Sequence, residues 1–383
     1  MIDPPATIFA FASKQVWPHV LTLMHFRPKR LILLHSRERD ESEEPARRLR
    51  EFVTKTRDLD IVVDPLETIP DDNFTAIQQK LDTIFAQKQL PVETSAVNFT
   101  GGNKLMAMAA FEWARGRGLR AFYLERNNKL IQFKFGHSQI ECEPPIKLNV
   151  SGTNDLDAIE LLTCQLGHGV LRSPGERLRL NEKGEKIPLA QVNAELRKVV
   201  RHDRVDFRKW LDIDTNKARE EREGDGLEYG VAVLLLRLGV PQVYRSVEFK
   251  PNVYSQLTEG ELDLVFNWSG RLWVVDCKDK VGGSQKLENL KTSLVANGVN
   301  LTTVQQHFDT LAEELSEKDI KVLREDLFQV SEVGGLLGSA IAVRSVRLPQ
   351  QAKEFADSRR PKVEVILKDE LEKRLRQLLS KSY

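Results

Sequence analysis

The sequence predicts an α/β protein with a doubly wound parallel sheet in its first half and a second α/β core near its end. Short apolar runs alternate with amphipathic stretches over residues 1–135, and two β-branched, aromatic-rich runs flank a polar turn within residues 261–278. A length of 383 residues allows two domains. We expect one domain at 1–150, a linker subdomain at 151–222 and a second domain at 223–383.

The composition is that of a folded globular protein, with 41% hydrophobic and 30% charged residues. The net charge of +1 does not indicate whether the chain binds nucleic acid, because a positive field can be local to one cleft. No apolar run reaches the length of about 18 residues that a membrane span needs, and Met1–Pro5 lacks the basic start of a signal peptide. Three cysteines and seven histidines, without metal-ligand spacing, are consistent with a reduced, cytoplasmic protein.

The first half alternates predicted strands with predicted helices, which indicates a Rossmann-like parallel sheet. The helical patterns fall near residues 40–54, 72–88 and 102–115. In such sheets, ligands bind beyond the carboxyl ends of the strands, where the strand order reverses. The strand-like runs are residues 7–11, 30–34, 60–63, 95–99 and 120–124.

Two loops follow the first and fourth predicted strands, which are neighbours in a doubly wound order. The first loop covers residues 12–19, and the second runs from Asn98 into a helix of small residues. Paired glycines at a helix start let a phosphate or ribose approach the backbone N–H groups. The second loop matches neither a Walker A loop nor a dinucleotide fingerprint, and a tight strand-to-helix turn explains it equally well. The candidate ligand-binding residues are Ser13, Gln15, Thr100, Gly101, Gly102, Asn103 and Lys104.

The most informative segment is a predicted hairpin with an acidic residue at each open end. Asp263 begins one strand, Asp276 ends the next, and the turn lies at residues 267–270. Antiparallel pairing places the two carboxylates side by side with Lys278 adjacent, and such a set can bind a divalent metal and stabilise a phosphoryl transition state. A solvated hairpin with charged ends is the alternative. We favour the metal site, because charges beside buried strands are costly unless paired or metal-bound.

Glu228 lies in the first turn of an apolar helix that precedes this hairpin and is closed by Gly239. A helix with Glu, a strand with Asp and a strand with Asp-x-Lys resemble the restriction-endonuclease-like, PD-(D/E)xK nuclease core. The resemblance implies that Asp263 and Asp276 hold Mn²⁺ or Mg²⁺ with the Cys277 backbone carbonyl. It also implies that Lys278 positions water or stabilises phosphate charge, and that Glu228 assists the metal shell. One departure is Asp276, where the family commonly has Glu.

The motifs of the first half resemble the CARF domain, the cyclic oligoadenylate sensor of type III CRISPR defence. The resemblance is carried by Ser-x-Gln after the first strand, at Ser13 and Gln15, and by Asn-x-Thr-Gly-Gly-x-Lys after the fourth, at residues 98–104. With the nuclease core, the chain is similar to CARF nucleases. That similarity implies activation by cyclic tetra-adenylate, a homodimer, and cleavage of DNA, RNA or both. The two-fold symmetry of a cyclic tetranucleotide suits two equal half-sites.

An apparent insertion departs from the family pattern after the second strand of the hairpin. The family has a Lys-Leu-x-x-Leu segment soon followed by a double glycine, whereas here Lys286 and Gly334 are separated by residues 296–332, with a helical pattern near 302–315. Lys286 is a possible substrate contact, and a solvated helix lysine is at least as good an interpretation. The last segment, 369–380, has the leucine spacing of an amphipathic helix.

Three other functions stay open at this point. The chain could be a ligand-sensing, DNA-binding regulator with an inactive nuclease core, although Glu228, Asp263, Asp276 and Lys278 are all present. It could be an endonuclease that needs no nucleotide, which would leave the two loops of the first half without a role. The sensor could also cleave its own ligand, but no acid–base pair in those loops requires this.

Overall fold

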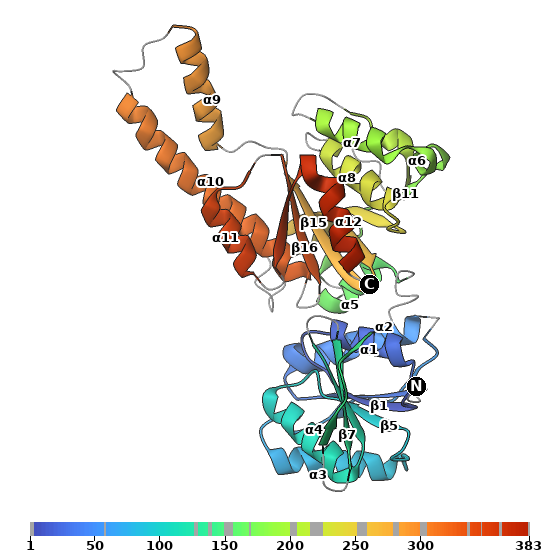
Figure 1. The fold of residues 1–383 in the computed structure, drawn as a ribbon. Helices are drawn as coiled ribbons and strands as arrows, with labels where there is room; N and C mark the ends of the chain where they lie inside the picture. Colours follow the sequence, from blue (N-terminus) through green and yellow to red (C-terminus); the bar gives the residue numbers. More distant parts are fainter. Residues whose placement is uncertain are drawn as a thin grey trace. The chain divides into compact units, whose positions relative to one another are not determined.

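The computed structural model describes most of the chain as two compact units, Met1–Val170 and Leu171–Tyr383, each built around its own sheet (Figure 1). None of the helices in the described part of the chain is long and apolar enough to cross a membrane. The described residues are 4–56, 59–125, 129–136, 140–148, 156–167, 170–199, 205–214, 225–250, 259–278, 283–298, 305–334, 338–345, 347–359 and 362–381.

The first unit has the doubly wound sheet that the sequence predicts. All five predicted strands are present, and β1 lies between β2 and β5, so the strand order reverses at β1 as expected. The antiparallel strands beyond β6 were not predicted. The strands are β1 (Thr7–Phe11), β2 (Arg30–His35), β3 (Val62–Val63), β4 (Glu67–Thr68), β5 (Ser95–Asn98), β6 (Arg120–Leu124), β7 (Lys129–Phe135), β8 (Ile140–Cys142) and β9 (Ile146–Lys147).

Helices cover both faces of this sheet (Figure 1). α3 (Phe74–Gln87) and α4 (Lys104–Arg117) pack on the face that carries Phe9 and Val97, while α1 (Trp17–Phe26) and α2 (Glu44–Lys55) lie on the other. α5 (Ala158–Leu166) packs against α2. The sequence placed residues 17–19 in a loop, but they form the first turn of α1, where Pro18 is tolerated because the N–H groups there have no helical partner.

The second unit contains a mixed sheet in the order β12, β11, β13, β14, β15, β16, β17. Antiparallel pairing runs as far as β15, and β15, β16 and β17 are parallel. The strands are β10 (Leu171–Ser173), β11 (Glu176–Leu180), β12 (Leu211–Asp214), β13 (Val243–Phe249), β14 (Gly260–Trp268), β15 (Arg271–Lys278), β16 (Ser339–Arg344) and β17 (Val363–Leu367).

Helices also sandwich the second sheet, which confirms the α/β/α core. α8 (Asp225–Arg237) and α12 (Leu371–Lys381) share one apolar core with β14 and β15, and α10 (Gln305–Gly334) and α11 (Gln350–Ser358) lie on the other face (Figure 1). The helical pattern expected near 302–315 corresponds to the first part of α10, which is 30 residues long. The remaining helices are α6 (Glu182–Lys186), α7 (Leu189–Lys198) and α9 (Gly283–Ala296).

Two details differ from the sequence-based expectations. The hairpin turn is only two residues long, because Asn267 and Trp268 are buried at the end of β14, and Ser269 and Gly270 take φ values of 52° and 70°. The residues expected to form a linker subdomain at 151–222 divide between the two units, and β10, β11 and β12 join the second sheet. β11 (ERLRL) and β12 (LDID) are only five and four residues long, and their alternation of apolar and charged residues suits strands near a sheet edge.

The packing of α8 against α7 predicts that Gly230 cannot be replaced by a larger residue without loss of stability. A Cβ added at Gly230 would lie 2.4 Å from Leu196 Cδ2 and 2.9 Å from Phe207 Cζ. We therefore expect Gly230→Val to lower the free energy of unfolding by about 1–3 kcal/mol through overpacking. Urea denaturation would measure the change. Gly116→Val in α4 is the matched control, because a Cβ there meets nothing within 4 Å; equal effects of the two substitutions would contradict the packing argument.

Candidate active site and ligand crevice

The β14–β15 hairpin brings Asp263 and Asp276 together. Leu264 pairs with Val275, so the next position along each strand places the two aspartates opposite one another. The Cys277 N–H donates a hydrogen bond to Asp263 Oδ2 at 2.6 Å. A backbone amide thus holds one carboxylate of the pair in place.

Asp276 has two cationic neighbours. Lys278 Nζ lies 3.2 Å from its Oδ1, and Arg344 Nη1, from the parallel strand β16, lies 2.6 Å from its Oδ2. Burial by itself raises the pKa of Asp276, but Arg344 and Lys278 outweigh burial and hold that pKa below its ordinary value. Asp276 is therefore the charged member of the aspartate pair.

Asp263 and Glu228 are affected in the opposite direction. Burial raises the pKa of Asp263 well above its ordinary value, and the nearby carboxylates of Asp276 and Glu228 add to the shift. Burial also raises the pKa of Glu228, to about 7, although Arg245 opposes this shift. Three carboxylates thus share a poorly solvated region, and a bound divalent cation would compensate their charge.

Glu228 is held by a buried cluster around Arg245 of β13, whose side chain is 3% exposed. The Arg245 guanidinium lies 2.7 Å from Glu228 Oε2, 2.8 Å from Glu176 Oε2 and 3.0 Å from the Tyr229 hydroxyl. It also pairs with Asp225. The first turn of α8 is in this way fixed to strands β11 and β13.

Several of these residues were not found from the sequence. Arg245 and Arg344 could have been found, because a charged residue within or at the end of an apolar strand indicates a buried charge that needs a partner, as it does for Asp276. Asp326 had none, since it is one of many charged residues of α10. Burial raises the pKa of Asp326 and the charge of Asp276 adds to this, which indicates that α10 brings a further carboxylate toward the pair.

The oxygen donors present fit a hard divalent cation. Within the described ranges, no three Asp, Glu, His or Cys side chains are grouped as a complete metal site. Mg²⁺ usually keeps several waters and binds through one or two carboxylates together with substrate phosphates. Asp263 and Asp276 supply two carboxylates, and the strand that carries Cys277 can add a backbone carbonyl. Lys286 lies exposed on α9, and no described contact joins it to these carboxylates.

The loops after β1 and β5, which the sequence predicts to line a ligand crevice, meet at the carboxyl ends of these two neighbouring strands. A Cβ added at Gly101 would lie 1.9 Å from the Phe11 carbonyl oxygen and 2.7 Å from His19 Nε2, so only glycine fits there. Gly102 takes a φ of 78°. The glycine pair therefore lets the second loop pack directly on the end of β1.

The polar side chains of the second loop mainly hold the loop itself. Thr100 Oγ1 accepts a hydrogen bond from the Leu124 N–H at 2.9 Å, and Asn103 Oδ1 caps α4 through the Met106 N–H at 2.8 Å. Lys104 is exposed at the N-terminus of α4, while Ser13 and Gln15 are half-buried in the first loop. Lys104 is thus an exposed cation of the predicted set that can face a ligand, together with the loop backbone.

A buried polar network joins the end of β5 to α1 beside these loops, and it was not predicted. Asn98 Nδ2 lies 3.1 Å from Thr22 Oγ1 and 3.4 Å from His19 Nδ1. Burial lowers the pKa of His19 to about 4, so its imidazole is neutral at physiological pH. His19 therefore supports the loop as a neutral hydrogen-bonding group.

Known proteins resemble this chain by sequence in the first unit and by fold over nearly its whole length. Residues 8–151 match the family model of the Card1 CARF domain. No curated protein matches the chain.

Solved structures share the fold over nearly the whole chain. Can2 from Sulfobacillus thermosulfidooxidans, solved with cyclic tetra-adenylate, has a TM-score of 0.56 and 16% identity, over 99% of this chain and 97% of that one. Protein VC1899 from Vibrio cholerae has a TM-score of 0.59 and 16% identity, over 98% of both chains. A type III CRISPR defence DNA nuclease activated by cyclic oligoadenylate has a TM-score of 0.53 and 18% identity, over 93% of this chain and 47% of that chain. Residues 8–151 are accordingly similar to the Card1 CARF domain, and the full chain shares its fold with Can2 and VC1899.

Proposed function

We propose that this protein is a metal-dependent endonuclease that cyclic tetra-adenylate activates, acting in type III CRISPR antiviral defence. The observation that carries the proposal is the Asp263–Asp276–Lys278 cluster at the open end of the β14–β15 hairpin, with Asp276 buried, in the same chain as a segment that matches the Card1 CARF model. Can2, which shares the fold, was solved with cyclic tetra-adenylate, and this supports the choice of activator.

In this proposal, Asp263 and Asp276 hold Mn²⁺ or Mg²⁺, with the Cys277 carbonyl as a further ligand. A bound cation of this kind lowers the pKa of its water and polarises the phosphodiester. Nearby charges, Asp276 first, raise the pKa of Lys278 despite partial burial, so Lys278 is a cation that can stabilise negative charge on the phosphate. Its side chain is 39% exposed and can therefore reach a substrate. Glu228 and Asp326 border the cation site.

The activator would bind in the crevice of the first unit. Ser13, Gln15 and Lys104 supply polar contacts, and the backbone of residues 100–104 at the start of α4 supplies N–H groups for phosphate. Two crevices in a two-fold homodimer match the symmetry of the cyclic tetranucleotide. The ligand would shift the population of subunit arrangements according to its differential affinity for them.

One observation favours the second candidate, a ligand-sensing DNA-binding regulator. Arg344 and Lys278 engage both oxygens of Asp276, so a cation has to share this carboxylate with two positive side chains. A site that kept these contacts permanently would bind no metal. The two candidates differ in whether nucleic acid is cut or only retained.

The proposal is tested by incubating the protein with Mn²⁺ and labelled single-stranded RNA, single-stranded DNA and supercoiled plasmid, with and without cyclic tetra-adenylate. We expect cleavage only in the presence of the activator. Activator binding and metal-independent retention of DNA without cleavage would support the regulator instead. Cleavage in both conditions would contradict the sensor assignment.

The cluster predicts which substitutions abolish cleavage without unfolding the protein. Lys278→Met and Asp263→Asn should each reduce cleavage at least about a hundredfold, because one removes phosphate stabilisation and the other a metal ligand. Both substitutions leave Arg344 paired with Asp276, which Asp276→Ala would not. Activator affinity, measured by calorimetry, should stay unchanged. Lys183→Met in α6 is the exposed control, and wild-type cleavage by both site variants would disprove the assignment.

The crevice predicts that Gly101→Ala weakens activator binding by at least about tenfold. The added Cβ would overlap the Phe11 carbonyl oxygen, so the second loop has to leave its position. Calorimetric titration with cyclic tetra-adenylate measures the loss, and a thermal melt shows that the fold persists. Gly116→Ala, in the α4 helix that follows the loop, is the control. Equal affinity of the Gly101→Ala and wild-type proteins would place the activator elsewhere.

The raised pKa values of Glu228 and Asp263 both predict a pH dependence of stability in protein kept metal-free with EDTA, and Glu228 is the group followed here. The folded protein holds the Glu228 proton up to about pH 7, whereas the unfolded chain releases it near the ordinary value of 4.5. The folded state thus binds more protons between these values, and the free energy of unfolding should fall as pH rises through this window.

Denaturation at several pH values measures this slope. Glu228→Gln should reduce the slope and leave the part that Asp263, whose pKa is also raised, contributes. Glu182→Gln on α6 should leave the slope unchanged, and Mn²⁺ should restore stability at the upper end. Asp276, whose pKa is lowered, contributes only below its ordinary value of 3.8 and does not affect this window. Parallel profiles for Glu228→Gln and the wild type would show that Glu228 is not the titrating group.

A further inference from the structure

The insertion between β15 and β16 forms a helical pair that has no core of its own. α9 and the first half of α10 extend away from the sheet of the second unit (Figure 1). From Lys286 to Asp326, no described residue is buried, and the first buried side chain of α10 is Leu327. Helices in globular proteins are usually stabilised by burying an apolar face, so this pair lacks the usual partner.

The same pair concentrates exposed apolar side chains. Leu290 is 51% exposed, Val295 58%, Leu311 44% and Val322 48%, and the other large apolar residues that the described chain exposes all lie in the first unit. Leu287 and Leu294 of α9 and Phe308 and Leu315 of α10 are half-buried, each pair seven residues apart. Two packed helices bury only the side chains that face each other, so the apolar residues on their outer faces remain exposed to a partner.

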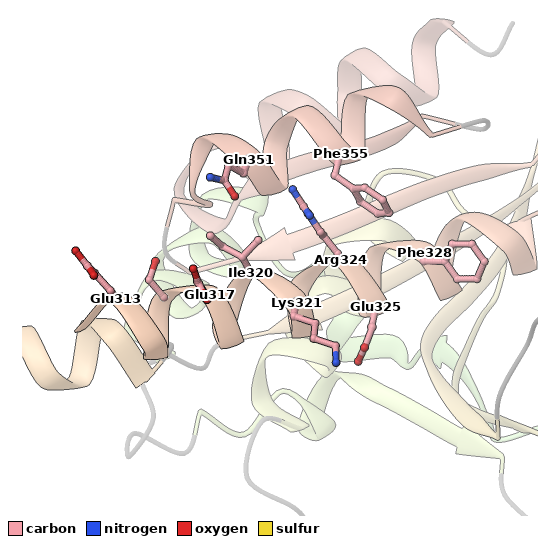
Figure 2. Close-up of a pocket in the computed structure, with 10 residues that line it drawn as sticks. Glu313, Glu317, Ile320, Lys321, Arg324, Glu325, Phe328, Gln351 and Phe355 are labelled. Atoms are coloured by element: carbon pink, nitrogen blue, oxygen red, sulfur yellow. The ribbon is translucent and has the colours of Figure 1, made fainter. Parts of the chain in front are cut away.

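A groove of about 960 Å³ lies beside this pair, between α10 and α11 (Figure 2). Its apolar lining comes from Ile320 and Phe328 of α10 and Phe355 of α11, while Glu313 and Glu317 lie at one end. Arg324 spans the middle, with its Cζ 5.8 Å from the centre of the Phe355 ring. The groove thus offers an apolar floor with an acidic end.

The charges of the two helices are complementary. α9 carries two lysines and one glutamate, whereas residues 305–321 of α10 carry five carboxylates and two lysines. Lys291 Nζ already lies 3.4 Å from Asp309 Oδ1 within the pair. The acidic outer half of α10 would repel a phosphate backbone, so its charge favours a protein partner with a basic helix over nucleic acid.

We propose that this surface joins two copies of the chain, with α9 of each copy seated in the α10–α11 groove of the other. The 14 residues of α9 span about 21 Å. The contact would place Leu290 on the apolar floor and Lys286, four residues earlier on the same face of α9, near Glu313 and Glu317. In the proposed dimer each copy contributes its helix and its groove at the same time, which makes the contact two-fold symmetric. The inference rests on the homodimer of the proposed function and assigns that dimer a contact.

Sedimentation equilibrium of the full chain, without activator, metal or nucleic acid, tests the contact. Leu290→Asp should raise the dimer dissociation constant at least about tenfold, because it puts a charge on an apolar interface. Val295→Asp should have a much smaller effect, because Val295 lies on a different face of α9 from Lys286 and Leu290. Ile140→Asp on β8 of the first unit is the matched control, since Ile140 is 47% exposed. Circular dichroism should show no loss of helix, because the substituted side chains are exposed.

A charge exchange makes the test specific for a second copy. Lys286→Glu and Glu317→Lys should each weaken the dimer, and the double variant should recover most of the loss, because it restores opposite charges across the contact. A monomeric wild type, a dissociation constant that Leu290→Asp leaves unchanged, or a double variant that is weaker than both single variants would overturn the proposal. A Lys286→Glu variant that dimerises normally but no longer cuts nucleic acid would also overturn the proposal, and would indicate nucleic acid as the occupant of this surface.

The assay separates this inference from the nuclease proposal. Lys278→Met should abolish cleavage and leave the dissociation constant unchanged. A protein that never cuts nucleic acid would still reveal the contact by its dissociation constant. Conversely, the protein could cut nucleic acid while Leu290→Asp and the charge exchange leave the dimer dissociation constant unchanged. That result would keep the nuclease proposal and refute only this interface.

Discussion

The second unit depends on the compensation of buried carboxylates by buried arginines. Asp276 is matched by Arg344, and Glu228 is matched by Arg245, with both guanidinium groups almost fully buried. Breaking such a pair by removing one partner typically costs about 3–5 kcal/mol, because the remaining charge stays desolvated. The two arginines therefore fix where the carboxylates can lie, and any chemistry of the site starts from that geometry.

The sheet topology explains how both arginines reach the hairpin. β13 pairs with β14 on one side and β16 pairs with β15 on the other, so each neighbouring strand contributes one arginine. Arg344 lies opposite Lys278 in a parallel register that six consecutive pairs define. The long insertion leaves β15 and returns at β16, yet it does not alter this register. The fold can thus carry a variable helical pair beside a fixed charge arrangement.

The sequence alone predicts the parts of this structure that depend on local pattern. The five strands of the first sheet, the hairpin with its two aspartates and the leucine-rich α12 all follow from periodicity and turn residues. α1 was missed because its Trp-Pro start looks like a loop, although proline is favoured in a first helical turn. The pairing of Arg245 with Glu176 and of Arg344 with Asp276 spans 69 and 68 residues, so it depends on strand order, which local pattern does not reveal.

α10 connects the two main features of the second unit. Its inner half packs on β15 and β16 and carries Asp326 toward Asp276 and Lys278, while its outer half carries the surface that we assign to a second copy. At 30 residues the helix is about 45 Å long and unbroken by proline. Contacts made at its outer half therefore constrain the orientation of the same rigid element that borders the carboxylates. In the proposed dimer, a helical insertion at this point in the chain would link subunit association to the geometry of the candidate active site without adding any residue to the hairpin.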